Sequence, residues 1–364
     1  MKKKRFLMMM LTTAVLLLTA SCSKDNDEPQ PVNPPTAAGA RLQVMLVFAP
    51  GQLGDQSYAD GILTASSALE YTNEHLQGTT DSIDVQFISL YSTNDTRKAL
   101  KQWAATTSNP FYEGTYERRL LVLTEPFMTA WLSDVQSGLR PTDEVLLMKV
   151  DEAYVEKTAT AYGLGERVHG LNIDLSPFIR KYCNYISSSI DSAEDPATFG
   201  EKPQVMLFRR FNAQQNTYCD GIEDIIRQEL GNKVSLTVTA LSDYAGNDGL
   251  SEETSMSFIQ AAYQASVEFE QHFANTGYGF VLTDLGTCSS GMDYYLVGRR
   301  AWNYEVLMID GNLENNSRLA ISRNPLAPFV DWTRSWMRQD AGTMPRFRQY
   351  DSSNVRYNMG DLWN

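Results

Sequence analysis

The sequence predicts an α/β protein with two similar lobes, because one pattern of strands and helices occurs twice along the chain. Short apolar runs alternate with amphipathic stretches, which is typical of parallel βαβ units. Four blocks also recur in the same order, roughly 160 residues apart. They pair Val44-Met45-Leu46 with Val205-Met206-Leu207, Asp60-Gly61-Ile62 with Asp220-Gly221-Ile222, Leu121–Glu125 with Phe280–Asp284, and Glu144–Met148 with Glu305–Met308. Two copies are too few for a solenoid, so we expect two lobes and a cleft between them, a favoured place for a small ligand.

The expected elements follow this alternation in both halves. In the first half we expect strands at 43–48, 84–91, 120–124, 144–150 and 168–173, and helices at 57–76, 95–107, 126–137 and 152–162. In the second half we expect strands at 204–208, 234–241, 279–283, 305–309 and 318–322, and helices at 215–230, 254–275, 288–301 and 311–315.

Each half ends in a serine or asparagine followed by proline, a pattern that starts helices. Ser176-Pro177 opens a helix after the first half, and Asn324-Pro325 opens one after the second. In the second of these helices, Phe329, Trp332 and Trp336 recur at helical spacing. We therefore expect this aromatic stripe to pack in the core and not to bind a ligand.

The N-terminus has the pattern of a targeting segment and is excluded from the fold. Lys2–Arg5 is basic, an apolar run follows to Leu18, and Thr19-Ala20-Ser21-Cys22 resembles the cleavage site of a bacterial lipoprotein. We expect residues 1–21 to be a signal peptide and Cys22 to carry lipid that anchors the chain to a membrane. The alternative is a plain secretory peptide with an incidental cysteine. The apolar run is too short for an ordinary membrane-spanning helix.

Residues 22–40 are polar and rich in proline, which predicts a disordered tether. The acidic run Ser23–Glu28 resembles the surface-export signal of lipoproteins in the Bacteroidetes; the alternative is a simple flexible linker. We therefore expect a lipid-anchored protein of the cell envelope, held at the outer membrane, with exposure at the cell surface as one option.

Charge, cysteine content and missing motifs narrow the function classes. The chain of 364 residues has a formal net charge of -13, which repels phosphate backbones, so we expect no nucleic-acid partner. Cys183, Cys219 and Cys288 allow at most one intramolecular disulfide. The spacings CxxC and HxxxH are absent, as are GxSxG, HExxH and P-loop patterns. We expect no metal, no cofactor and no enzymatic activity.

Candidate ligand-binding residues follow from the predicted strand ends, because parallel sheets bind ligands beyond the carboxyl ends of their strands. Polar, aromatic and glycine residues occur at these ends in both halves, and Arg323 falls where the chain would cross between lobes. The candidates are Gln52, Asp55, Tyr58, Glu125, Phe127, Asp151, Arg210, Gly286, Asp310 and Arg323.

The stretch Val47–Tyr58 is the first part of a family resemblance. Its Gly51, Asp55, Ser57 and Tyr58, with the later Gly286-Thr287, Met308–Asp310 and Ala320–Arg323, fit motifs in the same order. The chain thereby resembles the basic-membrane-protein (BMP) family, substrate-binding lipoproteins of ABC importers, several of which bind purine nucleosides. Ala49 departs from the family, which has a base-reading aspartate at that place.

The resemblance implies a type 1 periplasmic-binding-protein fold, in which two Rossmann-like lobes with parallel sheets are joined by three crossovers. Lobe one would contain residues 41–174 and 325–342, and lobe two residues 175–324 and 343–364. The resemblance also implies a solute-binding protein for uptake or sensing, with a small polar and nucleoside-like ligand. The partner would be a membrane permease or an outer-membrane transporter.

For a nucleoside-like ligand, Tyr58 or Phe127 would stack on the base, and Asp310 would accept hydrogen bonds from ribose hydroxyls. Arg323 would add a charge-assisted contact. Ordinary alternatives exist: Tyr58 belongs to the core, Asp55 caps the following helix, or Asp310 holds a turn with the next residue.

The remaining charged candidates also have two interpretations. Arg209 and Arg210 are either an anion site or partners of surface acids. Glu125, Asp151 and Asp284 are placed like acid–base carboxylates, but no nucleophile or metal motif accompanies them, which favours structural or binding roles. At the level of the whole protein, the rival function is a surface lipoprotein that keeps the binding fold but contacts a protein partner.

Overall fold

The computed structural model describes residues 41–50, 52–54, 58–75, 82–107, 115–193, 202–209, 221–240, 279–284, 304–310, 319–338 and 343–358. These residues belong to one compact unit, Gly39–Asn364. No described helix is both long and apolar enough to span a membrane. The expected signal peptide, the tether and Cys22 lie outside the described residues.

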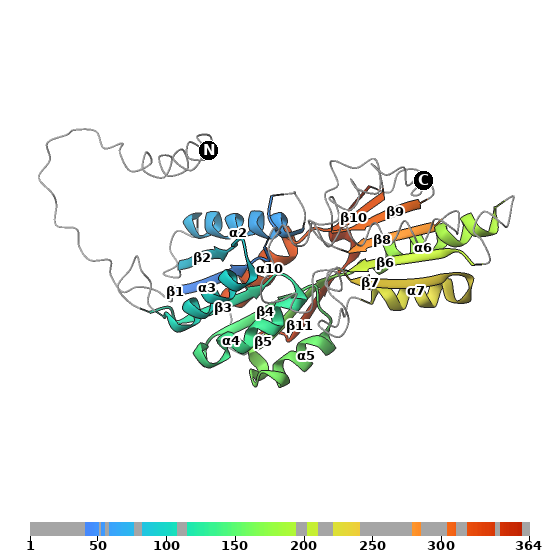
Figure 1. The fold of residues 1–364 in the computed structure, drawn as a ribbon. Coiled ribbons are helices and arrows are strands. Elements are labelled where there is room, and N and C mark those ends of the chain that lie inside the picture. Colours follow the sequence, from blue (N-terminus) through green and yellow to red (C-terminus); the bar gives the residue numbers. More distant parts are fainter. Residues whose placement is uncertain are drawn as a thin grey trace, which may run out of the picture. The chain divides into compact units, whose positions relative to one another are not determined.

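The first sheet has six strands in the order β11-β5-β4-β3-β1-β2, and all of its pairs are parallel (Figure 1). Its strands are β1 (Arg41–Val47), β2 (Ser82–Ile88), β3 (Arg118–Leu123), β4 (Glu144–Met148), β5 (Val168–Ile173) and β11 (Phe347–Tyr350). The connecting helices are α2 (Tyr58–His75), α3 (Thr93–Ala105), η1 (Pro126–Trp131), α4 (Leu132–Val135), η2 (Gln136–Gly138), α5 (Glu152–Ala161) and η3 (Gly165–Arg167), where η denotes a 3₁₀ helix.

The second sheet repeats this order as β12-β10-β9-β8-β6-β7, with β12 antiparallel to β10 and the other pairs parallel. Its strands are β6 (Gln204–Arg209), β7 (Ser235–Ala240), β8 (Gly279–Asp284), β9 (Tyr304–Ile309), β10 (Leu319–Arg323) and β12 (Val355–Asn358). The remaining described helices are α6 (Ser176–Asp191), α7 (Ile222–Leu230), η5 (Gly231–Lys233), α10 (Leu326–Met337) and η7 (Ser352–Asn354).

The chain passes between the two lobes three times. After β5 it continues into α6, which packs against α7, and after β10 it continues into α10, which packs against α2. The third passage joins β11 of the first sheet to β12 of the second. The expected fold class, two parallel-sheet α/β lobes joined by three crossovers, is therefore confirmed.

The C-terminal segment differs from the expected division of the chain, which gave residues 343–364 to lobe two. β11 pairs with β5, so that Phe347 lies beside Gly170 and Tyr350 beside Ile173 in the first sheet. The strand is short and only partly buried, so its sequence lacks the apolar run that marks the other strands.

The helix expected at 126–137 is also different, because it consists of a 3₁₀ turn, one α-helical turn and a second 3₁₀ turn. The part of the expected helix 215–230 that the structure describes begins at Ile222. The helices expected at 254–275, 288–301 and 311–315 lie outside the described residues.

Both faces of the sheets are covered by apolar side chains. Val44 and Leu46 of β1 belong to one buried cluster, whereas Met45 and Val47 of the same strand belong to another. Such two-sided burial is typical of parallel sheets and explains why their strands read as continuous apolar runs.

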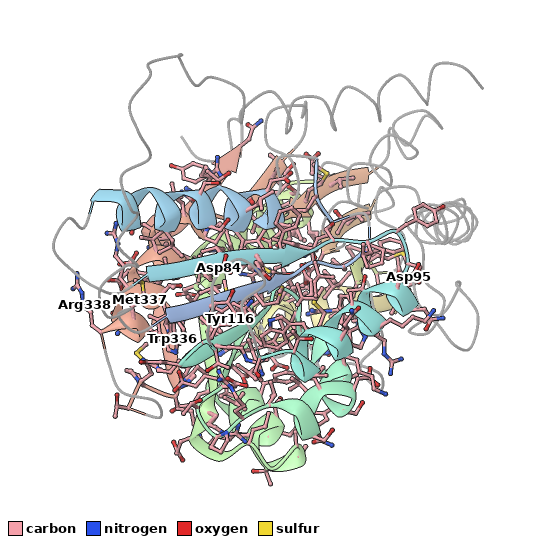
Figure 2. The ribbon with its side chains drawn as sticks, turned by 90° about the vertical axis from the view of Figure 1, so that its left-hand side faces the viewer. Asp84, Asp95, Tyr116, Trp336, Met337 and Arg338 are labelled. Carbon is pink, nitrogen blue, oxygen red and sulfur yellow. The ribbon has the colours of Figure 1, made fainter. Side chains whose placement is uncertain are left out.

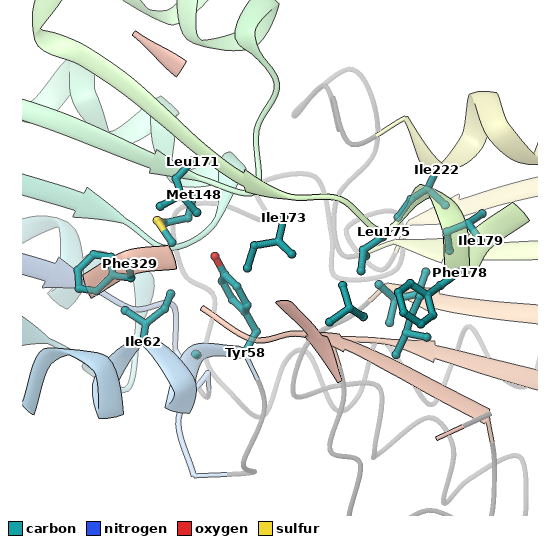
Figure 3. Close-up of a cluster of buried hydrophobic side chains, with 14 of the residues drawn as sticks. Tyr58, Ile62, Met148, Leu171, Ile173, Leu175, Phe178, Ile179, Ile222 and Phe329 are labelled. Carbon is teal, nitrogen blue, oxygen red and sulfur yellow. The ribbon is translucent and has the colours of Figure 1, made fainter. Parts of the chain in front are cut away.

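The aromatic stripe Phe329, Trp332 and Trp336 of α10 is fully buried, as expected. Figure 3 shows part of the first cluster, which extends from α2 past the first crossover to α6 and α7.

A buried ion pair lies at the amino-terminal ends of β3 and β4 in the first sheet. Arg119 at the start of β3 donates to Asp143 (Nη2 to Oδ2, 2.5 Å) and to the carbonyl oxygens of Trp103 and Thr106 at the end of α3. A guanidinium at a helix C-terminus satisfies carbonyl groups that the helix leaves without partners. On β2, Asp84 accepts a hydrogen bond from the Tyr116 hydroxyl (Figure 2). We assign a structural role to these groups.

Gly170 of β5 is required by a close approach of α5 to the sheet. A Cβ atom at this position would lie 2.4 Å from Cγ2 of Val155 and 3.0 Å from Cδ2 of Phe347. We expect Gly170→Ala to lower the free energy of unfolding by about 1–3 kcal/mol, because neither neighbour has a flexible end that can move away. Urea denaturation measures the loss. The double variant Gly170→Ala with Val155→Ala should lose less than the sum of the single losses, and strict additivity would contradict the clash.

Candidate functional site

The residues directly after β4 and β9 occupy equivalent places in the two halves. Lys149 and Asp310 both have a positive φ, 60° and 55°. The amide of Lys149 donates to the Leu171 carbonyl (2.9 Å), and the amide of Asp310 donates to the Ile321 carbonyl (2.8 Å). Non-glycine residues seldom adopt this conformation, which costs about 1–3 kcal/mol and is concentrated at functional sites. The repeat thus puts a cation and an anion at matching turns.

These two side chains meet between the sheets. Nζ of Lys149 lies 3.3 Å from Oδ2 of Asp310 and 2.7 Å from Oε1 of Glu125, which follows β3. Arg323, the last residue of β10, donates to Asp310 from Nη1, and from its amide to Oδ1 at 2.9 Å. All four are nearly or fully buried, between 0% and 9% exposed. We call Glu125, Lys149, Asp310 and Arg323 the charge chain; it links the carboxyl ends of strands from both sheets.

Gln52 fixes one end of the charge chain. Its Nε2 donates to Oε1 of Glu125 at 2.7 Å, and its Oε1 accepts from the amide of Ala49 at 2.7 Å. At the other end, Nε of Arg323 donates to the carbonyl oxygen of Ile173 at 3.4 Å. The chain of charges is therefore anchored to the loop after β1 and to the first crossover.

The two aromatic candidates have different surroundings. Tyr58 begins α2, and its ring centroid lies 4.6 Å from Nζ of Lys149, a cation–π contact. Phe127 is 2% exposed and packs edge-on against Trp131, with ring centroids 5.7 Å apart. Both rings belong to the core and differ in their neighbours: Tyr58 contacts Lys149 of the charge chain, whereas Phe127 packs against Trp131.

Burial and charge act in opposite directions on the charge chain. Burial disfavours the charged form of Lys149, but the attraction of Glu125 and Asp310 outweighs it and holds the pKa of Lys149 above its ordinary value. Burial likewise opposes ionisation of Asp310, yet Arg323 and Lys149 hold its pKa below its ordinary value. Burial raises the pKa of Tyr58 well above its ordinary value, so the phenol keeps its proton at neutral pH.

These directions predict the pH range in which the charge chain stabilises the fold. The pKa of Asp310 is depressed, so its contribution is complete above the ordinary value of 3.8 and is lost as the pH falls below it. The pKa of Lys149 is raised, so its contribution is complete below 10.5 and is lost as the pH rises beyond it. We expect the stability difference between wild type and Asp310→Asn, measured in urea, to shrink below pH 3.8. A difference that stays constant down to pH 2 would contradict this assignment.

The last residues of β6 and β8 in the second sheet form a second buried pair. Nη1 of Arg209 lies 3.4 Å from Oδ2 of Asp284, and the two residues are 4% and 8% exposed. Asp284 also contributes to the field that raises the pKa of Lys149. Arg209 thus pairs with an acid, as one of the two interpretations expected, but this acid is buried and not at the surface.

Of the remaining candidates, one is a helix cap and three lie outside the described residues. Asp151 precedes α5 and accepts a hydrogen bond from the amide of Tyr154 at 2.7 Å, which is the geometry of an N-cap. Asp55, Arg210 and Gly286 lie outside the described residues. The arrangement therefore brings together Gln52, Tyr58, Glu125, Asp310 and Arg323 of the ten predicted residues.

Lys149 was missed by the sequence reasoning, although it is central to the site. The fourth strand was expected to run to residue 150, which put Lys149 inside a strand instead of after its end. The repeat contained the missing signal: Glu144–Met148 aligns with Glu305–Ile309, so Lys149 aligns with Asp310, which was chosen.

Comparisons with known proteins give matches at the level of structure. No family model matches the chain, and no curated protein matches its sequence. Solved structures match over most of its length. One is an ABC transporter solute-binding protein from Agrobacterium vitis with bound allitol, at TM-score 0.53 and 11% identity, covering 88% of this chain and 96% of that one.

The fold is that of the type 1 periplasmic binding proteins. A carbohydrate transporter from Acidothermus cellulolyticus in complex with myo-inositol has TM-score 0.53 and 8% identity, covering 88% of this chain and 94% of that one. A putative LacI transcriptional regulator from Bacteroides fragilis has TM-score 0.53 and 8% identity, covering 89% and 98%. At such low identity the likeness to periplasmic binding proteins concerns the fold alone.

Proposed function

We propose that this chain is a solute-binding protein, not an enzyme, and that it takes a small, uncharged, hydroxyl-rich solute at the facing carboxyl ends of its two sheets. The observation that carries the proposal is the charge chain, in which buried polar groups from both lobes converge at the edge where parallel sheets bind ligands. Similar folds occur in proteins described with allitol and with myo-inositol.

The charges favour an uncharged ligand. Among the described residues of the site, the carboxylates of Glu125, Asp284 and Asp310 face the cations Lys149, Arg209 and Arg323. A charged ligand would pair with one of these groups and take it from its present partner. That partner would then stay buried without a counter-charge, which is costly. A hydroxyl group both donates and accepts, so neighbouring hydroxyls of one ligand can bridge a carboxylate and a cation.

A nucleoside is the narrower form of this proposal. Its ribose offers the same pair of neighbouring hydroxyls, and the family resemblance favours it. The base is less well supported, because the ring of Tyr58 is already in contact with Lys149 and Ala49 replaces the base-reading aspartate. Anchoring through lipid on Cys22, an envelope location and delivery to a permease also belong to the proposal. Loss of membrane association in Cys22→Ala would support the anchor.

Titration calorimetry of the purified full chain tests the ligand class with a panel of polyols, pentoses, hexoses and nucleosides. We expect heat from at least one hydroxyl-rich solute and a roughly tenfold to hundredfold weaker affinity in Glu125→Gln, which loses a charge-assisted hydrogen bond. The matched control is Asp191→Asn. It removes an exposed ion pair with Lys233, and neither residue belongs to the site. Affinity equal in all three proteins would contradict the assigned site.

One observation favours a second function. The side chains of the charge chain already satisfy one another, so a surface lipoprotein that retains the binding fold without a ligand would look the same. Absence of heat with every member of the panel, together with a protein partner bound by the purified chain, would favour this alternative.

A further inference from the structure

We infer that the ion pair between Lys149 and Asp310 is a latch that holds the two lobes together without a ligand, and that Lys149 couples ligand binding to closure. The latch is formed by described residues and holds whatever the identity of the ligand. It adds a role for Lys149 that the proposed function does not require.

The pair joins parts of the chain that belong to different sheets. Lys149 follows β4 of the first sheet, and Asp310 follows β9 of the second, yet Nζ and Oδ2 are 3.3 Å apart. Both side chains are buried, at 7% and 0% exposed. Water is largely excluded from this contact, so loss of the ion pair leaves buried charges with fewer partners. Separation of the lobes would rehydrate these charges.

Each half of the latch is held by a partner in its own lobe. Glu125 accepts from Nζ of Lys149 at 2.7 Å, and Arg323 binds both carboxylate oxygens of Asp310. These anchors remove most of the side-chain freedom that an ion pair otherwise loses when it forms. The anchors lie within lobes, whereas the Lys149–Asp310 contact joins the two lobes through their side-chain charges, so its loss is expected to report opening.

The first two crossovers make matching contacts with the third. Asp174 after β5 donates from its amide to the Tyr350 carbonyl at 3.0 Å, and Asn324 after β10 donates to the Asn354 carbonyl at 2.7 Å. Each side chain then accepts from the amide two residues later. Closure around such short element-terminal segments changes few other contacts. A bound solute would keep the lobes closed by bridging Glu125 and Arg323 with its hydroxyls, in place of the latch.

Hydrogen exchange of the ligand-free full chain tests the latch at amides in the lobe opposite to each substitution. In Lys149→Met we expect the amide of Arg323, which donates to Asp310 within lobe two, to exchange about tenfold faster. In Asp310→Asn we expect the same at the amide of Gln52, which donates to the Ala49 carbonyl in lobe one. At each of these two amides the double variant should exchange no faster than the more affected single variant, because the contact between the lobes is already lost in either single variant.

Two variants separate the latch from a general loss of buried charge. Lys149→Arg keeps the cation, and Glu125→Gln removes the partner in the same lobe but keeps Asp310, so both should leave the Arg323 amide protected. The amide of Val44 in β1, inside the core, serves as the folding reference in every variant. Faster exchange confined to the substituted lobe, or equal effects of Glu125→Gln and Lys149→Met, would overturn the inference. Neither outcome depends on whether a ligand is found.

Discussion

Asp310→Asn is expected to lower the free energy of unfolding by about 3–5 kcal/mol, because it removes an anion that contacts both cations of the charge chain. The amide side chain keeps the shape of the site and can still accept from the Arg323 amide. It cannot neutralise Arg323 and Lys149, which stay buried. Urea unfolding followed by tryptophan fluorescence measures the loss. An unchanged slope of the transition shows that the substitution acts on stability and not on the unfolded state.

The control for Asp310→Asn is a carboxylate outside the core. Asp191 pairs with Lys233 at 2.9 Å, but both side chains are about half exposed, so Asp191→Asn should change stability by less than about 1 kcal/mol. Equal losses in the two variants would show that burial does not set the strength of the Asp310 contacts.

Trp336→Ala is expected to cost a similar amount, about 3–5 kcal/mol, through a different mechanism. Trp336 lies near the end of α10 (Figure 2), is fully buried, and donates from Nε1 to Glu144 of β4. The guanidinium of Arg118 lies 4.6 Å from its ring centroid. Truncation therefore opens a cavity and also removes a hydrogen-bond donor from a buried carboxylate.

Leu326→Ala on the same helix is the matched control for Trp336→Ala. Leu326 is 39% exposed, so its truncation should cost less than about 1 kcal/mol in the same urea experiment. Because α10 lies after the second crossover yet packs on the first lobe, a large effect of Trp336 also tests this exchange of segments. A loss below about 1 kcal/mol at Trp336 would contradict its place in the core.

The fold could be predicted from the sequence where burial leaves a strong pattern. Strands buried on both faces read as apolar runs, and the duplication gave each run an independent second observation. β11 lacked this signal, because a four-residue edge strand with polar residues has no distinctive period. The broken helix at 126–138 was missed for a related reason, since 3₁₀ and α-helical turns share similar side-chain spacing.

The duplicated blocks did not keep the same physical role. Gly61 lies inside α2, where an added Cβ would be 2.9 Å from Cδ of Pro325 at the second crossover. Its counterpart Gly221 precedes α7 with a φ of 70° and has open space around it. One glycine permits close packing and the other a left-handed turn, and the sequence alone does not distinguish these needs.

The candidate site could be predicted as a place but not as a set of contacts. Strand ends gave Glu125, Asp310 and Arg323, because topology alone brings the carboxyl ends of parallel strands together. The position of Lys149 depended on whether β4 ends at residue 150 or, two residues earlier, at Met148, which periodicity does not resolve. That difference decides whether Lys149 lies inside the strand or follows its end into the site.

A crystal structure of the full chain with the tightest solute from the calorimetric panel tests the central claim most directly. We predict that the solute lies between the two sheets, with hydroxyls within hydrogen-bond distance of the carboxylates of Glu125 and Asp310 and of the Arg323 guanidinium. A solute bound elsewhere, with the four side chains still paired as they are here, would contradict the assignment of this charged cluster as the binding site.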